Sequence, residues 1–149
     1  MLPTESSRMM LSKPRERRKM SLQKFPVYAM VPCFDYERAK AWYREKLGLE
    51  PTEEEDMPGN AWYRCGEGTW FILSTSEYAG TAQNTAVGFT VSGIEAVMKE
   101  LRSNGVEFLE YDMGEMGKTQ NGLMSVGPYR GAWVKDSEGN ILEISEVIR

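Results

Sequence analysis

The chain has 149 residues, of which 41% are hydrophobic and 27% charged, and this suits one globular domain or two small fused modules. No apolar run approaches the roughly 20 residues that a membrane helix needs, so the composition excludes a helical membrane protein. The net charge of −4 is uneven, because residues 1–24 hold seven basic and two acidic residues, whereas residues 25–149 hold eleven and twenty. An acidic body argues against nucleic acid as its partner.

The sequence contains no histidine. This excludes the Ser-His-Asp and Cys-His arrangements, imidazole metal ligands and the commonest general base. Any catalysis would depend on Glu, Asp, Tyr, Lys or a cysteine without a histidine partner. The two cysteines, without a secretory segment, predict reduced thiols in a cytoplasmic protein.

Residues 1–24 are polar and basic and show no sustained periodicity, which predicts a disordered tail before a domain at 25–148. The basic cluster at 13–19 could bind an anionic surface, and Met20 could serve as a second start. The role of the tail stays open at this point.

The first half of the domain shows one strand, one helix and further strands. Alternation predicts a strand over 25–33, and Asp35 is a good N-cap for a helix whose apolar stripe ends at Gly48. A short strand at 49–51 and a hairpin over 60–75 follow.

The second half repeats this order. A strand over 86–91 precedes Ser92 and Glu95, which form a capping box for a helix that ends at Gly105. The rest predicts a strand over 106–111, a Gly- and Met-rich loop over 113–127, and strands over 131–135 and 141–146.

An internal repeat therefore organises the domain. Asp35 and Ser92 are 57 positions apart, as are Gly48 and Gly105. We expect an α+β fold of two tandem βαβββ modules, at about 25–78 and 84–148. Together they would form one curved mixed sheet with both helices on its outer face. The aliphatic face of each strand would pack on the helices, and the mixed face would form a concave surface.

Two short motifs in this order resemble those of the vicinal oxygen chelate superfamily, which includes glyoxalase I, bleomycin-resistance proteins and extradiol dioxygenases. They are Asp35…Ala39…Trp42-Tyr43…Leu47-Gly48-Leu49 and Lys135-Asp136-Ser137-Glu138-Gly139-Asn140-Ile141-Leu142-Glu143. The resemblance covers about residues 25–148 and implies a homodimer, because relatives commonly complete the cup with a partner.

The superfamily's metal enzymes carry His, Glu or Gln ligands at one position on each of four strands. By resemblance these positions fall on Tyr28, Ile72, Ala86 and Glu143, of which only Glu143 carries a matching residue. One carboxylate and one phenol are fewer than the three or four ligands of a stable divalent site. We therefore expect no cofactor, and a divalent metal held by other residues stays an open alternative.

Two hypotheses follow from different classes of protein. The first is a protein that binds a small organic molecule in the concave pocket without a metal. The second is a glyoxalase-like lyase, an isomerase or a dioxygenase that uses Glu143 in a metal-dependent or metal-free site. In the metal-free form Glu143 would be the base and Tyr28 the acid. The sequence names no ligand. Both hypotheses share a set of pocket positions: Tyr28, Met30, Trp62, Trp70, Ile72, Ala86, Gly88, Thr90, Ile141 and Glu143.

Each candidate also has a purely structural interpretation. Glu143 could brace the sheet by accepting hydrogen bonds from the backbone or from Tyr28. The aromatic residues could be core or dimer-interface packing, and Cys33 and Cys65 could be small buried hydrophobes.

Overall fold

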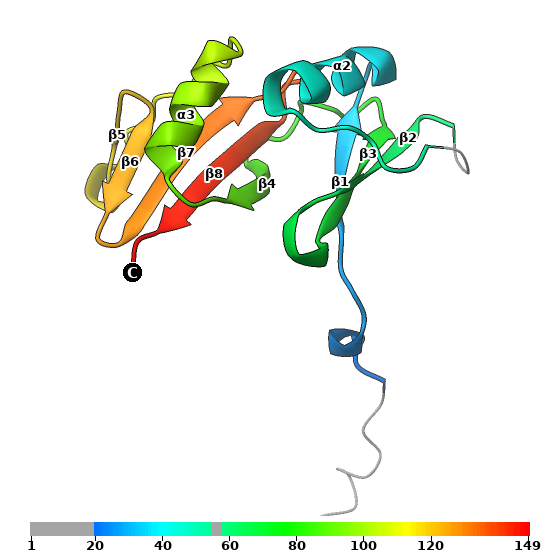
Figure 1. The fold of residues 1–149 in the computed structure, drawn as a ribbon, viewed down its shortest axis with the longest axis horizontal. Coiled ribbons are helices and arrows are strands. Elements are labelled where there is room, and N and C mark those ends of the chain that lie inside the picture. Colours follow the sequence, from blue (N-terminus) through cyan, green and yellow to red (C-terminus); the bar gives the residue numbers. More distant parts are fainter. Residues whose placement is uncertain (1–19, 55–57) are drawn as a thin grey trace, which may run out of the picture.

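The structure is a computed structural model that describes residues 20–54 and 58–149. The helices and strands of its first half and of its second half follow a similar order (Figure 1). The first half contains η1 (Leu22–Lys24), β1 (Ala29–Cys33), α2 (Tyr36–Leu47), β2 (Asn60–Arg64), η2 (Gly66–Gly68) and β3 (Trp70–Thr75). The second contains β4 (Thr85–Thr90), α3 (Ile94–Ser103), η3 (Gly114–Met116), β5 (Thr119–Gln120), β6 (Leu123–Val126), β7 (Tyr129–Lys135) and β8 (Ile141–Val147).

Helix α2 begins and ends where its sequence signals predict. The Asp35 side chain accepts a hydrogen bond from the Arg38 backbone N–H at 3.0 Å, which satisfies one unpaired donor of the first turn. Gly48 follows the last turn with φ of 69°, a conformation that costs glycine little. Both predicted ends of this helix are confirmed.

Helix α3 begins differently from the prediction. The capping box of Ser92 and Glu95 is wrong, because Gly93 is the N-cap and no side chain at that position accepts a hydrogen bond. The carboxylate of Glu146 on β8 accepts from the backbone N–H groups of Gly93 at 2.8 Å and Ile94 at 3.0 Å. A distant carboxylate thus caps the helix and ties it to the last strand.

The strands form two sheets. The orders are β1-β3-β2 and β4-β8-β7-β6-β5, with β1–β3 and β4–β8 parallel and the other pairs antiparallel. The predicted α+β class with mixed sheets and two helices is confirmed. The single continuous sheet is replaced by two, because β1 and β4 lie at neighbouring sheet edges without a ladder between them.

One hydrophobic core joins the two modules. Fully buried Val31, Tyr43 and Leu73 from the first module belong to the same cluster as Leu142 and Ile144 from the second. Helices α2 and α3 lie over the two sheets in Figure 1, and this core fills the space beneath them. The opposite face of each sheet is called the open face below.

Three segments differ from the sequence prediction. The strand expected over 106–111 is reduced to a bridge between Phe108 and Val134, and that over 49–51 is replaced by a bridge between Glu53 and Trp62. The loop expected over 113–127 contains the β5–β6 hairpin.

The N-terminal part of the domain begins later than expected. The first strand begins at Ala29, and most of the predicted tail, residues 1–19, lies outside the described residues. Within the described ranges, no helix is long and apolar enough to cross a membrane.

Candidate ligand-binding site

The open face of the first sheet carries an aromatic stack. The ring centroids of Tyr28 and Trp70 are 4.2 Å apart, and those of Trp70 and Trp62 are 4.7 Å apart with planes inclined by 8°. Ile72 is paired with Met30 on one side and with Trp62 on the other. Tyr28 and Met30 are exposed. The five pocket positions predicted on the first sheet therefore lie together, with Trp62 and Trp70 part-buried and Ile72 buried.

The five positions predicted on the second sheet lie on its two parallel strands. Gly88 of β4 is opposite Glu143 of β8, so the residue facing Glu143 is Gly88 and not Ala86. Thr90 follows on the same strand, and Ile141 is buried against a second small apolar cluster. Leu142 and Ile144 enter the main core, so alternation turns Glu143 to the open face.

Glu143 has a phenol partner that the sequence did not indicate. Tyr129 of β7 donates a hydrogen bond from its hydroxyl to Oε2 of Glu143 at 2.9 Å. The expected partner, Tyr28, stacks on Trp70 in the other sheet instead. The Tyr129 side chain lies along its own strand and passes over Gly131. This is possible because Gly131 has no side chain: a Cβ there would lie 2.6 Å from Cζ of Tyr129.

The phenol of the Tyr129–Glu143 pair has a perturbed pKa. Burial raises the pKa of Tyr129, and its hydrogen bond to Glu143 and the charge of that carboxylate raise it further. Tyr129 is therefore a neutral phenol that donates at neutral pH. It could supply a proton or a hydrogen bond, and it is a poor base.

A pocket of about 330 Å³ adjoins this pair. Its lining is almost entirely apolar and comes from β6, β7 and the segment around η3: Met113, Met116, Met124, Val126, Tyr129 and Trp133. Tyr129 belongs both to the pocket wall and to the pair with Glu143, so the carboxylate and the pocket are neighbours. None of these six residues is among the pocket positions predicted from the sequence, where the only signal was the richness of 113–127 in Gly and Met.

A larger groove of about 560 Å³ lies between the two sheets. It is lined by residues of β3 and β4 and by the turn at η2, and its only charged side chain is Glu67. Glu67 is exposed, and three of the predicted pocket positions, Trp70, Gly88 and Thr90, also line this groove.

The residues present do not fit the divalent metal that the resemblance implies. Of the four strand positions, Tyr28 and Ile72 lie on one sheet and Ala86 and Glu143 on the other, and only Glu143 is a carboxylate. Across residues 20–54 and 58–149, no three Cys, Asp or Glu side chains lie close enough together to hold a metal ion.

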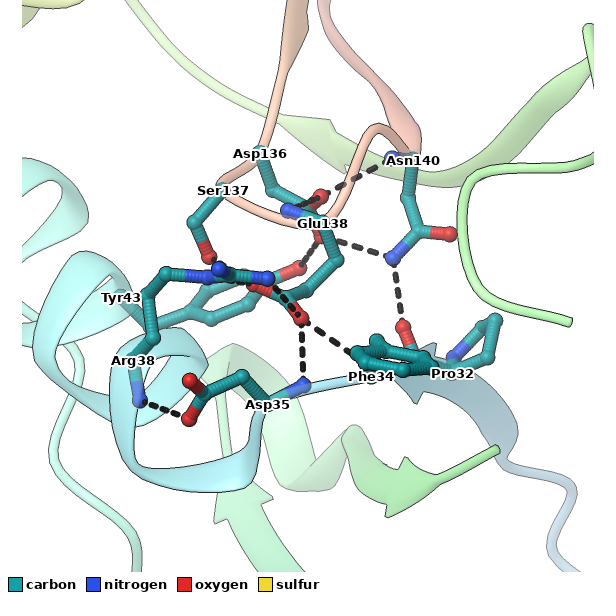
Figure 2. Close-up of polar contacts among 9 residues, drawn as sticks. All are labelled: Pro32, Phe34, Asp35, Arg38, Tyr43, Asp136, Ser137, Glu138 and Asn140. Atoms are coloured by element: carbon teal, nitrogen blue, oxygen red, sulfur yellow. Dashed lines mark hydrogen bonds and ion pairs between the residues drawn. The ribbon is translucent and has the colours of Figure 1, made fainter. Parts of the chain in front are cut away.

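A second polar cluster is centred on the turn between β7 and β8 (Figure 2). The side chain of Glu138 is fully buried, and its Oε1 accepts from the backbone N–H groups of Phe34 at 2.9 Å and Asp35 at 2.7 Å. Arg38 donates to both oxygens, at 2.9 and 3.1 Å, and Ser137 donates to Oε2. A carboxylate of the second module thus holds the start of α2 in the first.

Asp136 and Asn140 complete this cluster. Asp136 accepts from the Tyr43 hydroxyl at 2.6 Å and from the backbone N–H groups of Glu138 and Asn140. The Asn140 amide donates to the Pro32 carbonyl at 2.7 Å and to Asp136 at 2.8 Å. Nearly every donor and acceptor drawn in Figure 2 is used within the protein, so we interpret the cluster as a latch between the modules.

The cysteines are unsuited to nucleophilic chemistry. Both are free, and Cys33 is completely buried. Burial raises the pKa of Cys33 to about 11 and also raises that of Cys65, so both thiols stay protonated at neutral pH.

Paired modules of this order, with mixed sheets and helices on one face, define the class of protein. A family model described as "Glyoxalase/Bleomycin resistance protein/Dioxygenase superfamily" matches residues 26–144. The chain belongs to this superfamily, and the resemblance found in the sequence is confirmed. No curated protein matches the sequence significantly.

Solved structures agree with this assignment. A glyoxalase/bleomycin resistance protein from Catenulispora acidiphila DSM 44928 is 26% identical and has a TM-score of 0.61, with 83% of this chain and 98% of that chain covered. A glyoxalase/bleomycin resistance protein/dioxygenase from Alicyclobacillus acidocaldarius is 15% identical, with a TM-score of 0.57 and coverage of 87% and 96%.

A third similar structure contains a metal and a small molecule. It is the fosfomycin resistance protein FosX from Listeria monocytogenes, complexed with Mn(II) and 1S,2S-dihydroxypropylphosphonic acid. It is 12% identical, with a TM-score of 0.57 and coverage of 80% of this chain and 87% of that chain. At this identity the likeness shows the fold alone.

Proposed function

We propose that this protein binds a small organic molecule on the open face of the second sheet, without a metal. The observation that carries the proposal is the half-buried Glu143 carboxylate, hydrogen-bonded to Tyr129 beside an apolar pocket of about 330 Å³. An apolar cavity with a few fixed polar groups is the usual form of a small-molecule site. Membership of a superfamily that includes bleomycin resistance proteins supports it.

The proposal includes a cytoplasmic homodimer. Tyr28 and Met30 leave a large apolar surface on the open face of the first sheet, and Val27 beside them is 88% exposed. Exposed apolar patches of this kind commonly mark interfaces. Both sheets also end in edge strands that a partner could cover. A monomer by sedimentation at micromolar protein concentration would contradict this part of the proposal.

The experiment is a ligand screen by thermal shift, followed by calorimetric titration of the hits. It is run on the wild type, on Glu143→Gln and on Glu95→Gln, which changes an exposed glutamate of α3 as a control. If Glu143 serves a ligand, Glu143→Gln weakens binding by about tenfold or more and leaves the melting temperature nearly unchanged. A lower melting temperature with unaltered affinity per folded molecule shows a structural role and contradicts the proposal.

Metal use is tested on the same preparations. Elemental analysis of the purified protein and thermal shifts with Mn²⁺, Ni²⁺, Zn²⁺ and Fe²⁺ should show no stoichiometric metal and no saturable stabilisation, because one carboxylate is a weak ligand set. Stoichiometric metal that is lost in Glu143→Gln would refute the metal-free site.

An enzyme is the second candidate, and the Tyr129–Glu143 hydrogen bond favours it. A carboxylate and a neutral phenol 2.9 Å apart could act as base and acid on one bound molecule, with Tyr129 in the role predicted for Tyr28. Mass spectrometry of each confirmed ligand after prolonged incubation distinguishes the two hypotheses. A product whose formation is abolished in both Glu143→Gln and Tyr129→Phe would show catalysis, and an unchanged ligand would favour simple binding.

A further inference from the structure

The Glu143 carboxylate has one oxygen that is available to a ligand. Oε2 accepts from Tyr129, and Oε1 faces Gly88, where even an added Cβ would lie 3.6 Å away. Within residues 20–54 and 58–149, no basic side chain is paired with Glu143 and no hydrogen-bond donor reaches its Oε1. A half-buried anion with one free oxygen favours a partner that brings a positive charge.

The surroundings of this oxygen favour a cation over a neutral donor. Trp133 is the direct neighbour of Glu143 on β7, and its indole is 6% exposed on the same open face. Trp133 packs edge to face with Tyr111, with ring centroids 5.5 Å apart, so it forms an apolar wall beside the carboxylate. The segment beside the pocket adds exposed Glu110, Asp112 and Glu115 against a single Lys118. This acidic rim would repel an anionic ligand and attract a cationic one.

The adjoining pocket suits an apolar body rather than a second polar group. Three of its six lining residues are methionines. Met113 and Met116 are separated by three positions in the turn at η3, where side chains three apart lie on the same side. This turn lies close to β6 at Gly117, where an added Cβ would be 3.5 Å from Sδ of Met124. Flexible thioethers adapt to the shape of a hydrophobic guest.

From these contacts we infer that the ligand is an organic amine with an apolar body. Its ammonium group binds Oε1 of Glu143 beside Gly88, and its body fills the pocket lined by the three methionines. This inference rests on the proposed function and adds the chemical class of the ligand. The distribution of charge agrees with it, since residues 25–149 hold eleven basic and twenty acidic residues.

The test uses three compounds that share one body and differ only in the head group: 4-phenylbutylamine, 4-phenylbutanol and 4-phenylbutyrate. Their affinities are measured at pH 7 by calorimetry on the wild type, Glu143→Gln, Met124→Ala and the control Glu95→Gln. We expect the amine to bind about tenfold more tightly than the alcohol, and the carboxylate to bind most weakly. Glu143→Gln should bring the amine down to the alcohol's affinity, while Met124→Ala should weaken amine and alcohol by the same factor.

The location of the bound amine is determined by NMR of labelled methionine methyl groups. Addition of the amine should shift the methyl signals of Met113, Met116 and Met124, and leave that of Met30 on the other sheet unchanged. An alcohol that binds as tightly as the amine, at the same methyl groups, overturns the charged class and leaves the proposed function standing. Failure of all three compounds to bind overturns this inference, and the wider ligand screen then decides the proposed function separately.

Discussion

Replacing Glu138 by Gln tests the latch between the modules. Burial alone would raise the pKa of Glu138, but hydrogen bonds from Arg38, from the Asp35 backbone and from Ser137 outweigh it and lower the pKa to about 2. The ordinary value is 4.5. A folded-state pKa below the unfolded one means that the carboxylate stabilises the fold above pH 4.5, and that this contribution is lost as the pH falls towards 2.

The size of the effect follows from the two pKa values. A difference of about 2.5 units corresponds to about 3 kcal/mol of stability at pH 7, and linkage leaves about 1.5 kcal/mol at pH 3. In Glu138→Gln, one of the two oxygens becomes an N–H donor that faces Arg38 or the backbone N–H groups of Phe34 and Asp35. We therefore expect the variant to lose about 3 kcal/mol at pH 7, and its melting temperature to fall by about 6–12 °C.

The assay is urea unfolding followed by circular dichroism at pH 7, 5 and 3. The control is Glu45→Gln, which changes an exposed glutamate of helix α2, the helix whose start Glu138 binds, and should alter stability by less than about 0.5 kcal/mol. The difference between wild type and Glu138→Gln should be constant from pH 7 to 5 and should roughly halve by pH 3. A difference that is absent at pH 7, or that does not change with pH, would refute the argument from the lowered pKa.

Three further features are tested by substitution, and Gly48→Ala serves as a comparison for the first. Gly80 has a φ of +73°, and an added Cβ would clash with the backbone carbonyl of Glu138, so Gly80→Ala should lower the free energy of unfolding in urea by about 2–4 kcal/mol. Gly48 has a similar φ but lies in open space, so Gly48→Ala should lower it by only about 1 kcal/mol. Tyr43→Phe removes a buried 2.6 Å hydrogen bond to Asp136 and should lower the free energy of unfolding by about 2 kcal/mol; an unchanged value would show that Asp136 is satisfied without it. Glu146→Gln should speed hydrogen exchange of the first amides of α3 and leave α2 unaffected.

The sequence predicts the elements whose signals are local. Asp35 and Gly48 bound the first helix because a side-chain acceptor and a left-handed glycine act within one turn. The direction of Glu143 also follows from strand alternation. The α3 cap could not be predicted in the same way, since Glu146 reaches Gly93 from a strand 53 positions away.

Of the other differences between prediction and structure, one had a signal in the sequence and two had none. The β5–β6 hairpin turns at Asn121 and Gly122, both with positive φ, and Asn-Gly is a strong hairpin signal within the segment expected to be a loop. The pairing of Tyr129 with Glu143 has no such signal, because it depends on Gly131 leaving room for the ring. Splitting of the sheet between the two modules depends on packing in the shared core, which periodicity does not report.

The motif that identifies the superfamily and the candidate site lie on the same strand pair but serve different purposes. Asp136, Glu138 and Asn140 bind the first module through contacts that are internal to the protein. A few residues further, Glu143 points to the open face, and neither of its oxygens is needed by the latch. Because alternate residues of a strand face opposite sides, the open face can change its chemistry while the core face keeps the fold. This is why a chain can keep the superfamily's turn and lack the donor set of its metal enzymes, and why its function has to be argued from Glu143, Tyr129 and the methionine pocket.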